Sequence, residues 1–164
     1  MVCRRNELLT VIRTESRITI AGSVPEVWAY VCDVGRWPEW APTVLECRVR
    51  GGHPLQPGSR VDQRAKGILW SSRERSQQVT VVEAPRSVAF AGPMGTSSAR
   101  WGMELEPLAD RRTDAQMWIE VDLGGIMRAI PGRMLKARIQ RVSDLEMAAI
   151  KAAVESTPPL GSGS

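Results

Sequence analysis

The segment from Ser16 to Cys47 constrains the fold of this chain more than any other, because it specifies several elements in immediate succession. Arg17 to Ile20 alternates polar and apolar side chains with β-branched residues, a pattern typical of a half-buried strand. Ser23 then stands where it can cap a helix whose first turn holds Pro25 and Glu26. A glycine and an aromatic, proline-containing turn follow. The segment therefore predicts a strand, two short helices and a second strand.

The residues of this segment also resemble the opening of a known family. The matching positions are Ala21, Pro25, Glu26, Val27, Trp28, Asp33, Trp37, Pro38 and Trp40. The run is similar to the polyketide cyclase/dehydrase and lipid-transport proteins of the SRPBCC (START-like or Bet v 1-like) superfamily. The resemblance implies an α+β helix-grip fold. In that fold a bent, seven-stranded antiparallel sheet wraps around one long C-terminal helix, and a ligand cavity lies between them.

One branch of this family, the aromatase/cyclases, shows a partial likeness to the chain. The run from Trp70 to Arg75 is similar to that branch, whereas an inward Gln63 beside an outward Arg64 departs from it. The resemblance therefore leaves cyclisation, dehydration and plain ligand carriage open.

The length of 164 residues predicts a single domain with a sizeable core. We expect an N-terminal extension over residues 1–13, the START-like domain over 14–156, and a disordered tail rich in Pro, Gly and Ser over 157–164. Six Trp against one Tyr and one Phe give the core mostly indole rings. This composition suits a large apolar cavity with a few N–H donors at its edge.

The net charge of +4 comes from scattered basic residues, so no nucleic-acid partner is expected. Three cysteines without C-x-x-C spacing predict reduced, buried thiols rather than a disulfide framework. The apolar patch near the N-terminus is interrupted by Arg13 and is too short for a signal sequence or a membrane span. These features predict a cytoplasmic protein.

Period-two alternation predicts further strands as far as Leu123, joined by short turns in a meander. The strand from Ser71 to Glu83 has an ambiguous phase. If its last apolar residues point inward, strict alternation turns Gln78 and Glu74 inward as well. A bulge would reset the phase, because Val79 and Val81 compete for the same face.

A helix is predicted over residues 126–155, with a break at Pro131 and Gly132. On a helical wheel one stripe contains Met127, Ile130, Met134, Leu135, Arg138, Val142, Leu145, Ala149 and Ala152. Arg138 is the charged member of this stripe. It either enters the cavity or extends past the stripe to solvent.

Two residues are the candidates for catalysis. An inward Glu74 would have its pKa raised toward a useful acid or base, and Arg138 would polarise a carbonyl or hold a carboxylate. The alternative for Glu74 is an outward charge beside Arg73 or Arg75. The predicted ligand-binding residues are Tyr30, Trp37, Trp40, Gln63, Gln78, Phe90, Trp101, Met103, Met117 and Met134.

The single histidine, His53, lies in a Gly/Pro loop without a second ligand at metal spacing, so neither a metal nor an organic cofactor is expected. The predicted function is binding of a hydrophobic, oxygenated small molecule by a cofactor-free cyclase or dehydratase of secondary metabolism. A non-catalytic lipid carrier or sensor is the alternative. A third reading is an interaction module, such as a homodimer, that uses an outward-facing Trp118.

Overall fold

The computed structural model describes residues 11–66 and 72–158. Seven strands are present in this part: β1 (Val11–Ile20), β2 (Val44–Arg50), β3 (Arg60–Lys66), β4 (Ser72–Glu83), β5 (Ser87–Met94), β6 (Ser97–Leu108) and β7 (Arg112–Asp122). The helices are α1 (Val24–Cys32), α2 (Trp37–Trp40) and α3 (Gly132–Ser156), with short 3-10 turns η1 (Val34–Arg36) and η2 (Gly125–Ala129).

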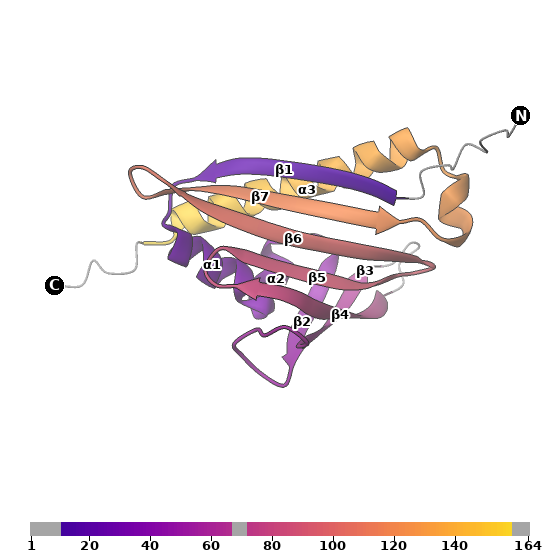
Figure 1. Ribbon diagram of the computed structural model, residues 1–164, viewed down its shortest axis with the longest axis horizontal. Coiled ribbons are helices and arrows are strands. Elements are labelled where there is room, and N and C mark those ends of the chain that lie inside the picture. Colours follow the sequence, from indigo (N-terminus) through magenta and orange to yellow (C-terminus); the bar gives the residue numbers. More distant parts are fainter. Residues whose placement is uncertain (1–10, 67–71, 159–164) are drawn as a thin grey trace, which may run out of the picture.

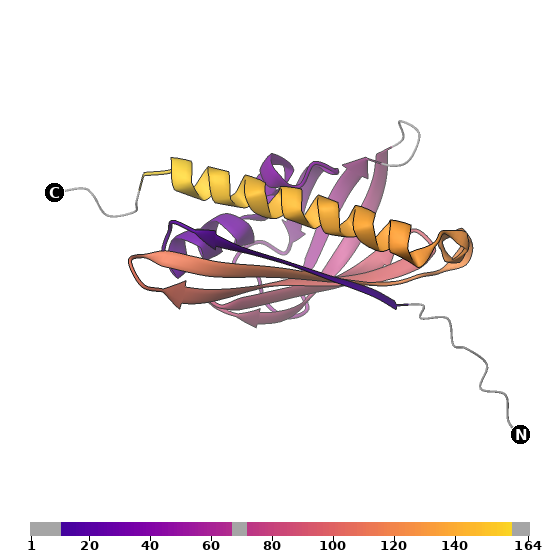
Figure 2. The ribbon, with the colours of Figure 1, turned by 90° about the horizontal axis from the view of Figure 1, so that it is seen from above.

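The strands form one antiparallel sheet in the order β1-β7-β6-β5-β4-β3-β2. Strands β2 to β7 make a meander, and β1 closes the far edge beside β7. The sheet bends so that α3 lies along its concave side, with α1 and α2 on the same side (Figures 1 and 2). The predicted helix-grip fold is confirmed.

Residues 11–13, which the sequence analysis assigns to the N-terminal extension, belong to β1 and pair with β7. The turn expected after β3 and most of the C-terminal tail lie outside the described residues. Among the helices described, none is long and apolar enough to cross a membrane.

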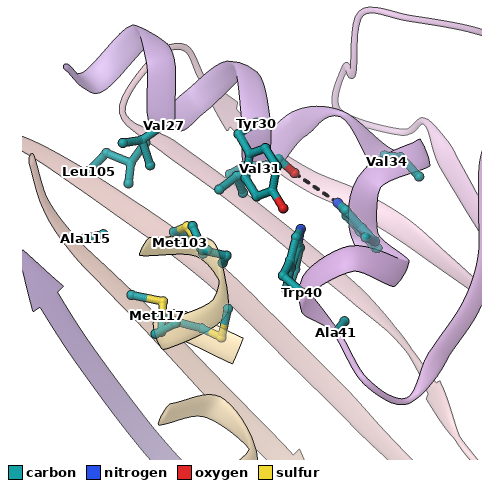
Figure 3. Close-up of a cluster of buried hydrophobic side chains, with 14 of the residues drawn as sticks. Val27, Tyr30, Val31, Val34, Trp40, Ala41, Met103, Leu105, Ala115 and Met117 are labelled. Atoms are coloured by element: carbon teal, nitrogen blue, oxygen red, sulfur yellow. Dashed lines mark hydrogen bonds between the residues drawn. The ribbon is translucent and has the colours of Figure 1, made fainter. Parts of the chain in front are cut away.

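The predicted cap and aromatic turn hold α1 and α2 in place. The backbone N–H and the hydroxyl of Ser23 both donate to the Glu26 carboxylate at 2.7 Å, which fixes the start of α1. The indole N–H of Trp37 donates to the Val31 carbonyl at 2.9 Å and ties α2 back to α1. Figure 3 shows Val27, Tyr30 and Val31 of α1 facing the sheet that carries Leu105 and Met103.

A bulge in β4 decides which of its side chains face α3. The pairing with β5 shifts register between Val79 and Val81, and Val79 is 1% exposed whereas Val81 is 37% exposed. Before the bulge, Gln77 shares the inner face with Val79. The prediction that Gln78 and Glu74 face inward is wrong, since both are exposed. Alternation counted back from the end of the strand crosses the bulge and therefore inverts the phase.

The break before α3 is confirmed, but the predicted inner stripe of the helix is largely wrong. Met134 is 67% exposed, Leu145 is 56% exposed, and Arg138 is exposed as well. The buried residues are Leu135, Ser143, Met147, Ile150 and Val154. Because α3 carries apolar side chains on two neighbouring stripes, its periodicity alone does not identify the face that packs on the sheet.

Trp118 lies on the outer face of the sheet, as predicted, but it does not form an open apolar patch. A Cβ atom added to Gly102 would lie 2.7 Å from the Trp118 ring, so the indole rests directly on this glycine of β6. The Arg13 guanidinium covers the ring at 5.5 Å from its centroid. The side chain is half-buried between these two residues.

Candidate functional site

A cavity of about 170 Å³ lies between α2, the inner face of the sheet and α3. Its lining comprises Trp37, Trp40, Ala41, Thr43, Val44, Gln63, Arg75, Gln77, Gly92, Pro93, Met94, Ala99, Trp101, Met117, Ile119 and Glu146. Most of these side chains are apolar or aromatic, and the few polar ones converge from β3, β4 and α3. Such a combination is typical of a small-molecule site.

Stacked and crossed aromatic rings form the most rigid wall of the cavity. Trp101 stacks on Phe90 with ring centroids 4.4 Å apart and an interplanar angle of 17°. Trp37 meets Trp101 edge-on at 5.2 Å. The indole N–H of Trp101 donates to Oε1 of Gln77 at 2.8 Å, so the ring is fixed at both its face and its edge.

Glu146 of α3 brings a carboxyl group to this apolar surface. It has no hydrogen bond or salt bridge with any described residue, and burial raises its pKa from 4.5 to about 7. Part of its surface stays open because it borders the cavity. A carboxyl group with a pKa near neutral pH exchanges protons readily in both directions, which is what a general acid or base requires.

Arg75 and Gln63 supply the other polar groups, and they face each other across β3 and β4. Arg75 is half-buried and forms no salt bridge with the residues that the structure describes. Gln63 is buried, and its Oε1 accepts from the Cys47 thiol at 3.7 Å. Burial raises the pKa of that thiol to about 12, so Cys47 carries little of the nucleophilic thiolate form near neutral pH.

Trp40 adds a hydrogen-bond donor that has no acceptor within the described chain. The side chain is buried and lines the cavity, but its indole nitrogen is unpaired. In Figure 3 the nitrogen lies at the edge of the ring that faces Tyr30. A buried donor without an acceptor costs about 1–3 kcal/mol. A ligand oxygen would remove this cost.

The structure brings together five of the predicted site residues at the cavity: Trp37, Trp40, Gln63, Trp101 and Met117. Phe90 and Met103 are buried in the core behind the wall. Tyr30 faces a separate groove near the end of α3, where its hydroxyl donates to Glu39 at 3.1 Å. Burial and this bond raise the pKa of Tyr30 to about 12.

The remaining four predicted residues lie outside the cavity lining. Glu74 and Gln78 are exposed on β4, and Met134 and Arg138 are exposed on α3. The prediction that they line the cavity is wrong for two reasons. The inward-facing residues of β4 are the ones that alternation assigned to solvent, and α3 packs on the sheet through a different stripe from the predicted one.

Sequence reasoning missed Glu146, Arg75 and Gln77. The signal for the two β4 residues was the competition between Val79 and Val81, which marks the bulge. For Glu146 the signal was its position four residues before Ile150, on the apolar stripe that is buried.

An antiparallel sheet wrapped around a long helix, with a polar-edged apolar cavity between them, defines a helix-grip ligand-binding domain. Residues 11–155 match the family model described as polyketide cyclase/dehydrase and lipid transport. The chain belongs to this family. No curated protein matches the sequence.

Solved structures show the same fold at low sequence identity. A START superfamily protein from Mycobacterium smegmatis has a TM-score of 0.73 and 17% identity, covering 87% of this chain and 97% of that one. A conserved protein from Geobacillus kaustophilus has a TM-score of 0.70 and 18% identity, covering 87% and 95%. The Zhui aromatase/cyclase from Streptomyces sp. R1128 has a TM-score of 0.72 and 15% identity, covering 94% and 99%.

Proposed function

We propose that the chain binds a hydrophobic, oxygenated small molecule in the cavity and acts on it as a cofactor-free cyclase or dehydratase of secondary metabolism. The observation that carries this proposal is Glu146, a carboxyl group on an apolar cavity wall that has no partner among the described residues and whose pKa is raised to about 7 by burial. Its placement supports proton transfer to and from a bound carbonyl compound. The similarity to an aromatase/cyclase fold agrees with this chemistry.

The proposed reaction is an intramolecular aldol condensation. The Glu146 carboxylate removes a proton from the carbon beside a carbonyl, and the resulting enolate carbon attacks a second carbonyl carbon. A C–C bond forms, and the alkoxide takes the proton back from Glu146. In the dehydration step, Glu146 removes a second α-proton and returns it to the leaving hydroxyl group. One water molecule is released, and the carboxylate is regenerated.

Arg75 and the cavity walls have supporting roles in this proposal. The guanidinium group of Arg75 would stabilise the negative charge that develops on the enolate oxygen. The fixed aromatic wall of Trp37 and Trp101 would hold the ligand in one reactive conformation. Glu74 and Arg138, the candidates from sequence, are too exposed to receive the same roles.

A non-catalytic carrier is the second candidate, because the family description includes lipid transport. A carrier would use the same cavity for affinity alone. Native mass spectrometry of the freshly purified protein, followed by denaturing extraction, identifies the chemical class of any bound molecule. The two candidates then differ in whether Glu146 changes that molecule or only contacts it.

Exchange of the methyl protons of acetophenone in D₂O, followed by NMR, tests the proton transfer directly. We expect the wild-type protein to accelerate exchange, with a rate that rises through pH about 7 as Glu146 ionises. Glu146→Gln should lower the protein-catalysed rate by about 10²-fold or more. Glu74→Gln, which removes an exposed carboxylate, is the matched control and should leave the rate unchanged.

Acceleration that survives Glu146→Gln would contradict the assignment of the base. No acceleration by the wild-type protein, together with an unmodified small molecule that co-purifies with it, would favour the carrier.

A further inference from the structure

The cavity is smaller than the sites that usually bind drug-sized molecules. Its volume of about 170 Å³ is well below the ~300–1,000 Å³ of sites for drug-sized ligands. It is close to the ~150 Å³ of an engineered apolar cavity that holds one benzene ring. The space inside the cavity therefore matches one six-membered ring with a substituent, and a fused ring system would extend beyond its opening.

The side chains that set this limit are held in place. Trp101 is fixed by its stacking on Phe90 and by its bond to Gln77. Trp37 is 2% exposed and is anchored to α1 through the Val31 carbonyl. Met117 on the floor of the sheet is buried as well. A larger ring system would have to displace these groups, at the cost of their packing.

The cavity also carries a charge preference. Arg75 and Glu146 are the only titratable groups among the described residues of its lining, and the two do not form a salt bridge with each other. At mildly acidic pH Glu146 is neutral and Arg75 is charged, so the lining has a net positive charge. On the outer face of β3, by contrast, Asp62 pairs with Arg50 at 2.9 Å and Arg64 with Glu46 at 2.7 Å. Arg75 is half-buried at the cavity and has no such carboxylate partner among the described residues.

We propose that the cavity accepts a single ring that carries an anionic oxygen, a carboxylate or a phenolate, with this oxygen at Arg75. Any longer chain leaves the cavity beside Thr43 and Pro93, the exposed residues of the lining. This inference rests on the proposed function and narrows it, because a cyclase with this cavity closes one ring and not several.

Isothermal titration at pH 6 with benzoate, 2-naphthoate and anthracene-2-carboxylate tests the size limit on the full chain. We expect benzoate to bind and each added ring to weaken binding at least tenfold. Met94→Ala removes a half-buried side chain from the lining and should restore binding of 2-naphthoate.

The charge preference is tested with two matched variants. Arg75→Gln should weaken benzoate binding about tenfold and leave the neutral isostere benzamide unaffected. Arg73→Gln removes the same charge from an exposed position outside the lining of the same strand and should change neither ligand.

Three results would overturn the inference. Tighter binding of 2-naphthoate than of benzoate by the wild-type protein would show that the cavity is not limited to one ring. Equal effects of Arg75→Gln and Arg73→Gln would show that Arg75 does not hold the anion. Either result leaves the proposed function standing, because a ligand still occupies the cavity. Failure of every probe to bind would overturn the proposed function together with the inference.

Discussion

Two glutamates on α3 show how the surroundings of a side chain decide its chemistry. Glu155 accepts from the Lys151 ammonium at 2.6 Å and from the Ala21 N–H at 2.8 Å, and these bonds lower its pKa. Glu146 on the same helix has no such partner within the described chain, and burial raises its pKa to about 7. The first carboxylate is a structural group and the second is available to a ligand.

The groove beside Glu155 and the cavity beside Glu146 also differ in how far their charged groups are paired. The groove at Glu155 is the larger, about 660 Å³, and most of its charged groups are paired: Arg111 lies 3.0 Å from Glu26 and Arg36 lies 3.8 Å from Asp33. The cavity at Glu146 is about 170 Å³ and is lined by a carboxyl group and a guanidinium group that form no ion pair within residues 11–66 and 72–158. A carboxyl group that is largely buried without a described partner, and not volume, distinguishes the candidate site from this groove.

Replacing the cavity wall should have the largest effect on stability. Trp37→Ala removes a side chain that is 2% exposed, together with its contacts to Phe90 and Trp101, and we expect a loss of about 3–5 kcal/mol in the free energy of unfolding. Urea denaturation followed by circular dichroism measures it. Trp118→Ala on the outer face is the control and should cost about 1 kcal/mol, because that ring is only half-buried. Equal losses would mean that the cavity wall is not part of the core.

Removing the unmatched carboxyl group should stabilise the protein. The pKa of Glu146 is raised in the folded state, so between pH about 4.5 and 7 the folded form binds a proton that the unfolded form has released. The wild-type protein therefore loses stability as the pH rises through that range. Glu146→Gln removes this penalty. We expect a gain on the order of 2 kcal/mol at pH 8 and none at pH 4, measured by urea denaturation at both values.

Glu74→Gln provides the comparison for this prediction, since Glu74 is exposed and its change should move stability little at either pH. A loss of stability in Glu146→Gln at pH 8 would mean that the carboxylate has a partner after all. The assignment of Glu146 as an available acid or base would then be withdrawn.

The sequence predicts the fold well because several independent local signals agree. The cap at Ser23, the aromatic turn around Trp37 and the period-two strands each specify one element, and the structure contains all of them. The three cavity tryptophans also follow from the sequence, since two come from that turn and one from the regular alternation of β6.

The polar half of the site does not follow from the sequence, because it depends on phase. A single extra residue at the β4 bulge exchanges Glu74 and Gln78 for Arg75 and Gln77 on the inner face. On α3 a shift to the neighbouring stripe exchanges Arg138 for Glu146. Both stripes of the helix are apolar enough to be buried. Only packing against the sheet chooses between them.

Replacing Glu155, the paired glutamate, should have the smallest effect on the free energy of unfolding, and the opposite sign to that of Glu146→Gln. The pKa of Glu155 is lowered in the folded state, first by its bond to Lys151, so its contribution to stability is present above its unfolded pKa and is lost as the pH falls. Glu155→Gln should therefore destabilise the protein at pH 7, by less than about 1 kcal/mol because the pair is at the surface. The loss should shrink at pH 3 and in 1 M salt, which screens exposed pairs. Thermal melts of the two glutamine variants at pH 7 should then shift in opposite directions. Shifts in the same direction would mean that the partners around each carboxylate do not decide its role.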